Sequence, residues 1–84
     1  MLQPKLLAVQ PLHPLMLRLE YDTGEIKLFD VEPYATGFWF SQLLNPSYFA
    51  MVRVLPNGVG IEWPNGQDIA PHELYESSRY EENN

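Results

Sequence analysis

Apolar and polar residues alternate from Leu15 to Tyr21, as they do in a strand that buries one face and exposes the other. The turn-forming sequence Asp-Thr-Gly-Glu follows, and an extended apolar pattern resumes from Ile26 to Val31. Before this pair lies a short apolar stretch over residues 5–10, which is closed by prolines, as is typical of a strand at the edge of a sheet. Residues 5–31 are therefore predicted to form an edge strand and a hairpin.

Charged residues suggest the register of this first hairpin. If Thr23 and Gly24 form the centre of its loop, Glu20 lies opposite Lys27 on the face away from the leucines. The same register pairs apolar residues on the other face: Tyr21 with Ile26, and Leu19 with Leu28. Opposite charges across a strand pair contribute about 0.2–1 kcal/mol, and a slip of one residue would turn the apolar set to the wrong face. We therefore predict this pairing.

A second hairpin is predicted around Asn57 and Gly58, a dipeptide that tight turns prefer because both positions take a positive φ. This loop places Arg53 opposite Glu62 on one face of the hairpin. Apolar residues meet on the other face: Val54 with Ile61, and Val52 with Trp63. Charge and hydrophobicity therefore agree on this register.

The turn sequence Pro-Asn-Gly occurs again at residues 64–66, and it predicts a third, brief strand over Gln67–Ile69. A two-residue Asn-Gly loop would place Asp68 opposite Trp63, on the apolar face. A carboxylate in that place needs hydrogen bonds to offset its burial. Either Asp68 has such partners, or the strands pair in another register.

A short helix is predicted near residues 36–45, because Phe40, Leu43 and Leu44 share one face at helical spacing. Thr36 is the candidate N-cap of this helix. The dipeptide Asn-Pro that follows Leu44 is predicted to end it.

Pro71 suits the first position of a C-terminal helical turn, where its missing N–H would be unpaired anyway. Residues 79–84 are polar and are predicted to be a frayed tail, which leaves a single domain over residues 1–78. The predicted fold class is α+β. It consists of a small antiparallel sheet of two hairpins in a meander, packed by one short helix and followed by the helical turn.

Charge narrows the classes of partner. The 84-residue chain has eleven Asp and Glu against five Lys and Arg, which gives a net charge of −6. Proteins bind nucleic acids and anionic membranes through clustered positive charge, so we expect neither as a direct partner of this chain. An acidic chain is instead suited to a basic protein partner. The chain has no Cys, no apolar run of membrane-spanning length and no basic leader sequence. We therefore expect a cytoplasmic protein without disulfides or thiolate metal sites.

The titratable residues do not form a recognisable reaction centre. His13 and His72 are far apart in the sequence and lack a ligand spacing such as His-x-x-x-His. One conceivable metal or acid–base cluster comprises Glu62, Asp68, His72 and Glu73. A cross-strand ion pair, a turn and a helix N-terminus explain these carboxylates better. We therefore predict no catalytic residue, no metal site and no cofactor.

The aromatic residues suggest an interaction surface. On a helix Phe38, Trp39 and Phe40 point about 100° apart, so at least one of them faces outward, and Trp39 is the candidate. The alternative is that Trp39 covers one end of the sheet as part of the core. Exposed Trp and Tyr are enriched at binding surfaces. We therefore predict a non-enzymatic module that binds another protein, or a second copy of itself, through Tyr34, Trp39 and the face from Trp63 to Tyr75.

A competing hypothesis belongs to a different functional class. It is a small-ligand-binding or enzymatic domain with a pocket beside Trp63, Asp68 and His72. A hydrogen bond between Asp68 and His72 within such a pocket would favour this second hypothesis.

Several phrases along the chain form a recognisable series. The hairpin over Leu17–Asp30 is followed by Tyr34, Gly37 and Phe40, and then by the aromatic pair Tyr48-Phe49. The last phrase, at residues 63–75, is Trp-Pro-x-Gly-x-Asp-Ile-x-Pro-x-x-Leu-Tyr. This series covers nearly the whole chain and resembles one family of short bacterial proteins, the domain of unknown function 2442 family.

The resemblance implies a small α+β module that stands alone or is joined to a helix-turn-helix domain. No such extension is expected here, since few residues follow the last phrase. Genes for such proteins often lie beside the gene for another short protein, and a toxin–antitoxin relationship has been suggested for these pairs. The resemblance therefore implies an antitoxin-like role and brings no catalytic residues.

Overall fold

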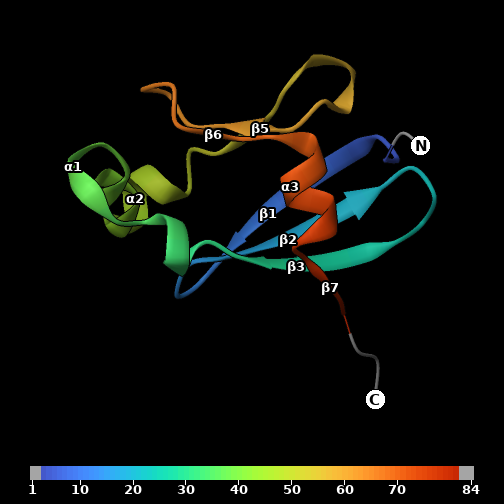
Figure 1. Cartoon of the computed structure of the whole chain (residues 1–84), viewed down its shortest axis with the longest axis horizontal. Helices are drawn as coiled ribbons and strands as arrows, with labels where there is room; N and C mark the ends of the chain where they lie inside the picture. Colours follow the sequence, from blue (N-terminus) through green and yellow to red (C-terminus); the bar gives the residue numbers. More distant parts are fainter. Residues whose placement is uncertain (1–2, 82–84) are drawn as a thin grey trace.

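Two antiparallel sheets and several short helices make up the computed structural model, which describes residues 3–81 apart from the side chain of Trp39 (Figure 1). The larger sheet contains, in this order, β1 (Leu6–Leu12), β2 (Met16–Tyr21), β3 (Ile26–Asp30) and β7 (Arg79–Tyr80). The smaller sheet contains β4 (Arg53–Val54), β5 (Ile61–Glu62) and β6 (Asp68–Ile69). The fold is α+β, as predicted, and β1 is an edge strand. The two hairpins belong to separate sheets.

Short helices connect and cover these sheets. They are η1 (Glu32–Tyr34), α1 (Gly37–Phe40), η2 (Ser41–Leu44), α2 (Pro46–Phe49), η3 (Pro56–Gly58) and α3 (Pro71–Glu76), where η marks a 3₁₀ helix. Figure 1 shows α1 and α2 beyond one end of the larger sheet, while α3 crosses one of its faces. The helical turn predicted from Pro71 is confirmed as α3.

The helix predicted near residues 36–45 is confirmed as α1 followed directly by η2. Thr36 precedes α1, but its side chain makes no capping hydrogen bond. Asn45 follows η2 and caps α2, because its Oδ1 accepts hydrogen bonds from the backbone N–H groups of Ser47 at 2.9 Å and Tyr48 at 3.4 Å. The Asn-Pro pair therefore separates two helices, because proline is well suited to the first position of the second.

The β2–β3 register differs from the predicted one by one residue. Ile26, not Lys27, lies opposite Glu20. The loop contains three residues rather than two, and it is closed by a hydrogen bond from the Tyr21 N–H to the Glu25 carbonyl at 3.0 Å. Such loops use a left-handed glycine at their last position and shift the pairing by one residue. The predicted Glu20–Lys27 pair is therefore wrong, and Lys27 lies on the buried face.

The β4–β5 register is confirmed. Arg53 lies opposite Glu62, and the distance between Arg53 Nη2 and Glu62 Oε1 is 2.7 Å. Val54 lies opposite Ile61, as predicted. The loop between these strands contains two consecutive residues with a φ of 65°, as its Asn-Gly sequence predicts.

A close backbone contact joins this loop to the larger sheet. A Cβ atom added at Gly58 would lie 2.6 Å from the carbonyl oxygen and 2.8 Å from the nitrogen of Leu6. Real Cβ atoms do not approach backbone atoms so closely, and φ is positive at this position. The contact between η3 and β1 therefore requires glycine.

The β5–β6 loop differs from its prediction in the same way as the first hairpin. The Trp63 N–H donates to the Gln67 carbonyl at 2.8 Å across a three-residue Pro-Asn-Gly loop. Asp68 consequently lies opposite Glu62 rather than Trp63, and its side chain is exposed. Gln67 takes the buried position instead. Of the two alternatives for Asp68, the change of register is confirmed.

The C-terminal end of the described chain pairs with the larger sheet. Arg79 and Tyr80 form β7 beside β3, and the Glu81 carboxylate accepts hydrogen bonds from Arg18 Nε at 3.2 Å and Nη2 at 3.3 Å. The frayed tail predicted from residue 79 is therefore wrong for residues 79–81. A two-residue strand is too short to leave an alternating pattern. Residues 82–84 of that prediction lie outside the described residues.

One buried cluster draws side chains from both sheets and from η2, α2 and α3. Its members are Leu6, Leu17, Leu19, Tyr21, Phe29, Val31, Ala35, Leu43, Phe49, Ile61, Trp63, Ile69 and Leu74. The cluster holds the smaller sheet and the helices against the larger sheet, since burial of apolar side chains is the main favourable contribution to folding.

Candidate functional site

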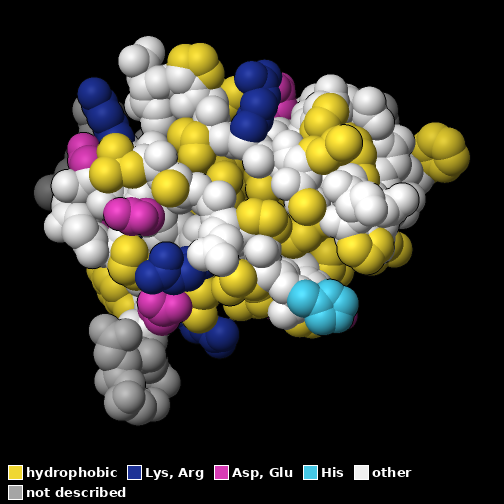
Figure 2. Space-filling view, turned by 180° about the vertical axis from the view of Figure 1, so that it is seen from behind, with side chains coloured by type: hydrophobic (Ala, Val, Ile, Leu, Met, Phe, Trp, Pro, Cys, Tyr) yellow, Lys and Arg dark blue, Asp and Glu magenta, His cyan; other side chains and the backbone are white. Residues whose placement is uncertain are grey.

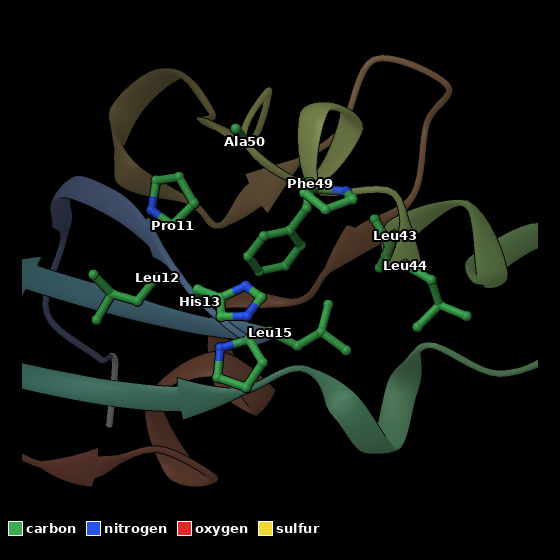
Figure 3. Close-up of a pocket in the computed structure, with 10 residues that line it drawn as sticks. Pro11, Leu12, His13, Leu15, Leu43, Leu44, Phe49 and Ala50 are labelled. Carbon is green, nitrogen blue, oxygen red and sulfur yellow. The ribbon is translucent and has the colours of Figure 1, made fainter.

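An apolar groove of about 300 Å³ lies between the β1–β2 turn and the helices η2 and α2 (Figure 3). Its lining residues are Pro11, Leu12, His13, Pro14, Leu15, Leu43, Leu44, Pro46, Phe49 and Ala50. Leu43 and Phe49 are buried, whereas the Leu44 side chain is 58% exposed. His13 is the one ionisable side chain in this lining. The groove can hold apolar groups, but it has few polar groups that could orient a substrate.

Local sequence rules create the helical wall of the groove. A 3₁₀ helix has three residues per turn, so the adjacent residues Leu43 and Leu44 must point in different directions. Leu43 enters the core and Leu44 remains exposed beside the groove. Asn45 then ends η2 and caps α2, which places Phe49 inward one turn later. The wall is therefore apolar both in its buried and in its exposed residues.

Hydrogen bonds tie this wall to the β5–β6 loop. Tyr48 Oη donates to Gln67 Oε1 at 2.5 Å and accepts the Asn65 N–H at 2.8 Å. Gln42 Oε1 accepts from Asn65 Nδ2 at 2.6 Å and from Gln67 Nε2 at 3.0 Å. The buried Gln67 amide thus bonds to both η2 and α2. Such a satisfied network fixes the groove before any ligand arrives, which lowers the entropic cost of binding.

A smaller hollow of about 190 Å³ adjoins the groove, since Pro14 and Leu15 line both. Its other lining residues are Met16, Asp30 and Glu32. Both carboxylate residues are exposed, and Asp30 Oδ1 accepts the Glu32 N–H at 3.0 Å. The groove therefore has one acidic end.

A cluster of polar groups around Glu25 attaches α3 and β7 to the larger sheet. The Glu25 carboxylate accepts hydrogen bonds from Thr23 Oγ1 at 2.6 Å, Tyr80 Oη at 2.7 Å and Tyr75 Oη at 2.8 Å. These bonds, that from Thr23 most of all, lower the pKa of Glu25 from 4.5 to about 2. Lys27 Nζ lies 4.0 Å from the Tyr75 ring centre and 4.7 Å from that of Tyr80. The partners of this cluster all come from the chain itself.

This set of hydrogen bonds makes stability depend on pH. Because the pKa of Glu25 in the folded protein lies below its ordinary value of 4.5, the carboxylate stabilises the fold above about pH 4.5. That stabilisation is lost as the pH falls toward 2. A Glu25→Gln variant should therefore have a lower urea midpoint than the wild type at pH 6, and the two midpoints should converge toward pH 2. A difference that does not change with pH would contradict the assignment.

Trp63 is a core residue. Its side chain is fully buried, and its Nε1 donates to the Phe49 carbonyl at 2.9 Å. The prediction that Trp63 forms part of a binding surface is therefore wrong, because Trp63 lies two residues after Ile61 and on the same buried face. The side chain of Trp39, the other predicted Trp, lies outside the described part of the structure.

The remaining predicted binding residues are at the surface or partly exposed. The Tyr34 hydroxyl donates to Glu73 Oε2, and this bond raises the pKa of Tyr34. Tyr75 is half-buried and bonds to the carboxylate cluster described above. Asp68 and His72 are exposed. Binding roles for these four residues stay predictions.

The groove residues were not predicted as a site. The sequence pattern predicts that Leu43 and Leu44 share one helical face, whereas adjacent residues of a 3₁₀ helix point apart. Because Leu43 and Leu44 are consecutive, the sequence did contain a sign that one of the two leucines would be exposed. The groove itself forms only where the β1–β2 turn meets η2 and α2, which lie about 30 residues further along the chain.

Two further observations limit the chemistry of residues 3–81. No helix in this region is long and apolar enough to cross a membrane. Within the same region, no group of three or more His, Cys, Asp or Glu side chains is placed to hold a metal ion.

The fold and the groove define a small α+β domain with a preformed apolar groove that is acidic at one end. The chain belongs to the family described as Protein of unknown function (DUF2442), which it matches over residues 6–80. This range includes both sheets and every residue that lines the groove. Neither the search of curated proteins nor that of solved structures found a match.

Proposed function

We propose that this protein is a non-enzymatic interaction module that docks an apolar side chain of a partner protein in the groove. The observation that carries the proposal is a preformed apolar groove with an exposed leucine beside it. Its volume of about 300 Å³ suffices for one or two side chains, since a cavity of about 150 Å³ accommodates benzene. The scarcity of polar lining groups supports a side chain over a small polar substrate.

Exposed apolar side chains extend this surface along the helices. Phe38 in α1 is 92% exposed, and α1 leads directly into η2, which carries Leu44. Figure 2 shows apolar side chains scattered over this face, including the end of the molecule that carries α1 and α2, while the charged side chains lie mostly toward the other end. Contiguous exposed apolar surface marks interaction sites in soluble proteins.

Charge supports the choice of partner. A net charge of −6 attracts a basic protein and repels a second copy of the chain. A heterologous partner is therefore favoured over the homodimer that the sequence left open. We infer a cytoplasmic setting from the absence of cysteine. An antitoxin-like role remains an expectation that rests on the family resemblance.

The competing hypothesis, an enzymatic or ligand-binding domain beside Trp63, Asp68 and His72, has less support. The Trp63 ring is enclosed in the core, so a ligand cannot reach it. Asp68 and His72 are exposed side chains, and the two hollows described above have other lining residues.

Substitution of Leu44 tests the proposed function. Leu44→Glu places a charge at the edge of the apolar groove, where docking would bury it, and should abolish capture of the partner. Leu7→Glu is a matched control, because Leu7 is 59% exposed against 58% for Leu44 and lies on β1 outside the groove lining. The measurement is quantitative affinity purification of each tagged full-length variant from its native cells. Circular dichroism should show both variants folded, since surface substitutions change stability by about 0.5 kcal/mol or less.

A protein that co-purifies with the wild type and with Leu7→Glu, but not with Leu44→Glu, supports the proposal. A partner that both variants retain, or that both lose equally, would place the binding surface elsewhere.

A further inference from the structure

Among residues 3–81, no basic side chain forms an ion pair with the acidic end of the groove. Asp30 and Glu32 line the smaller hollow, which shares Pro14 and Leu15 with the apolar groove. An occupant of the groove that extends past these two shared residues therefore meets two exposed carboxylates. The pair of hollows combines an apolar contact with a negative charge on one continuous surface.

Three of the basic residues have other partners within the fold. Arg18 bonds to Glu81 and Arg53 bonds to Glu62, and these are the ion pairs among residues 3–81. Lys27 is buried and donates to the Tyr75 carbonyl at 2.8 Å. Asp30 Oδ1 accepts the Glu32 N–H, but neither carboxylate has an ion-pair partner among residues 3–81, so both can receive a cation from outside.

Resting on the proposed function, we propose that the partner segment carries an apolar side chain followed closely by Arg or Lys. The apolar side chain fills the groove, and the basic side chain contacts Asp30 and Glu32. Arg fits best, because its planar guanidinium can donate to two carboxylates at once. Side chains on one face recur every second residue in a strand and every third or fourth in a helix, which gives a spacing of about two to four residues.

Charge favours this occupant over the alternatives. A second copy of the chain would bring the same net charge of −6 to the acidic end. Anionic membrane lipids would be repelled for the same reason. Two carboxylates are fewer than the six to eight oxygen ligands that a calcium ion takes. A basic side chain attached to an apolar anchor satisfies both parts of the surface.

Synthetic peptides test this inference. The probes are decapeptides of Gly and Ser with blocked ends. Each carries one apolar residue (Leu, Phe or Trp) and one Arg, placed two to four residues apart. Each has a control peptide, its twin, in which Gln replaces Arg. The ¹⁵N-labelled full-length protein is titrated with each peptide, and amide chemical-shift changes give Kd. Four forms are compared: the wild type, Asp30→Asn with Glu32→Gln, Asp22→Asn with Glu76→Gln as an equally charged control at exposed sites, and Leu44→Glu.

We expect the wild type and the control to bind the best Arg peptide about threefold to tenfold more tightly than its Gln twin. The variant without Asp30 and Glu32 should lose this preference while its affinity for the Gln peptide is unchanged. A preference that survives in that variant, or that is absent from the wild type, overturns the inference and leaves the proposed function standing. Peptides that bind the wild type no better than Leu44→Glu overturn both. Light scattering on the same samples measures the oligomeric state. If the wild type is a dimer and Leu44→Glu is a monomer, the groove binds a second copy of the chain, and the proposed basic occupant is rejected.

Discussion

Replacement of Trp63 with Ala is expected to lower the free energy of unfolding by about 3–5 kcal/mol, the usual effect of truncating a fully buried aromatic side chain. Trp63 is completely buried, lies beside the Phe49 ring with 5.8 Å between ring centres, and donates to the Phe49 carbonyl at 2.9 Å. Loss of the indole leaves a cavity and removes the shorter of two hydrogen bonds to that carbonyl, which also accepts the Val52 N–H at 3.4 Å. Urea unfolding followed by circular dichroism measures the effect.

The control for this variant is Trp63→Phe, which keeps most of the apolar contact and removes the hydrogen bond. Its expected loss is about 1–2 kcal/mol, well below that of Trp63→Ala. An alanine variant within about 1 kcal/mol of the wild type would show that Trp63 is not the core residue described here. Because Phe49 also lines the groove, the same contact links the core to the proposed binding surface.

Gly58→Ala should destabilise the protein by about 2–5 kcal/mol through two additive effects. A side chain at a φ of 65° carries a backbone strain of about 1–2 kcal/mol. The new Cβ would also lie 2.6 Å from the Leu6 carbonyl oxygen, so the backbones of η3 and β1 must separate. Overpacking of this kind adds about 1–3 kcal/mol. The measurement is again the urea midpoint.

Gly24→Ala is the matched control for this effect. Gly24 also has a positive φ, of 90°, but no atom lies within 4 Å of the Cβ that alanine would add. We therefore expect only the strain contribution, about 1–2 kcal/mol. If the two alanine variants were equally destabilised, the close contact between η3 and β1 would contribute nothing to the destabilisation caused by Gly58→Ala.

The sequence predicted the second hairpin correctly and the other two turns incorrectly for one physical reason. In the Asp-Thr-Gly and Pro-Asn-Gly loops the glycine is the third loop residue, and each loop shifts the pairing by one position. Hydrophobic pattern alone did not detect the shift, because Lys27 and Ile26 can each face the core if their neighbours accommodate them. Lys27 does so by bonding to the Tyr75 carbonyl, a partner 48 residues away that no local pattern reveals.

The candidate site shows the same limit of local reasoning. Alternation explains why Leu17 and Leu19 are buried, and helical geometry explains why Leu44 is not. The groove, however, depends on contacts between the β1–β2 turn and two helices distant in sequence. The last phrase of the sequence, residues 63–75, is mainly structural, since Trp63 belongs to the core and Tyr75 bonds to Glu25.

The groove and its acidic end together explain features that the fold alone does not require. A stable core needs Leu43 and Phe49, but it does not need an exposed Leu44 or an exposed Phe38 on neighbouring helices. It also does not need two exposed carboxylates without ion-pair partners among residues 3–81. The proposed recognition of an apolar and basic partner segment would account for both.

The most direct test of groove docking is the partner's affinity for three forms of the full-length protein, measured by isothermal titration calorimetry with the protein that co-purifies with the wild type. Docking in the groove predicts that Leu44→Glu weakens Kd by about tenfold or more, as loss of a central contact does. Leu7→Glu, with equal exposure, should change Kd by less than about twofold. An unchanged Kd for Leu44→Glu, or an equal loss in both variants, would contradict a function for the groove.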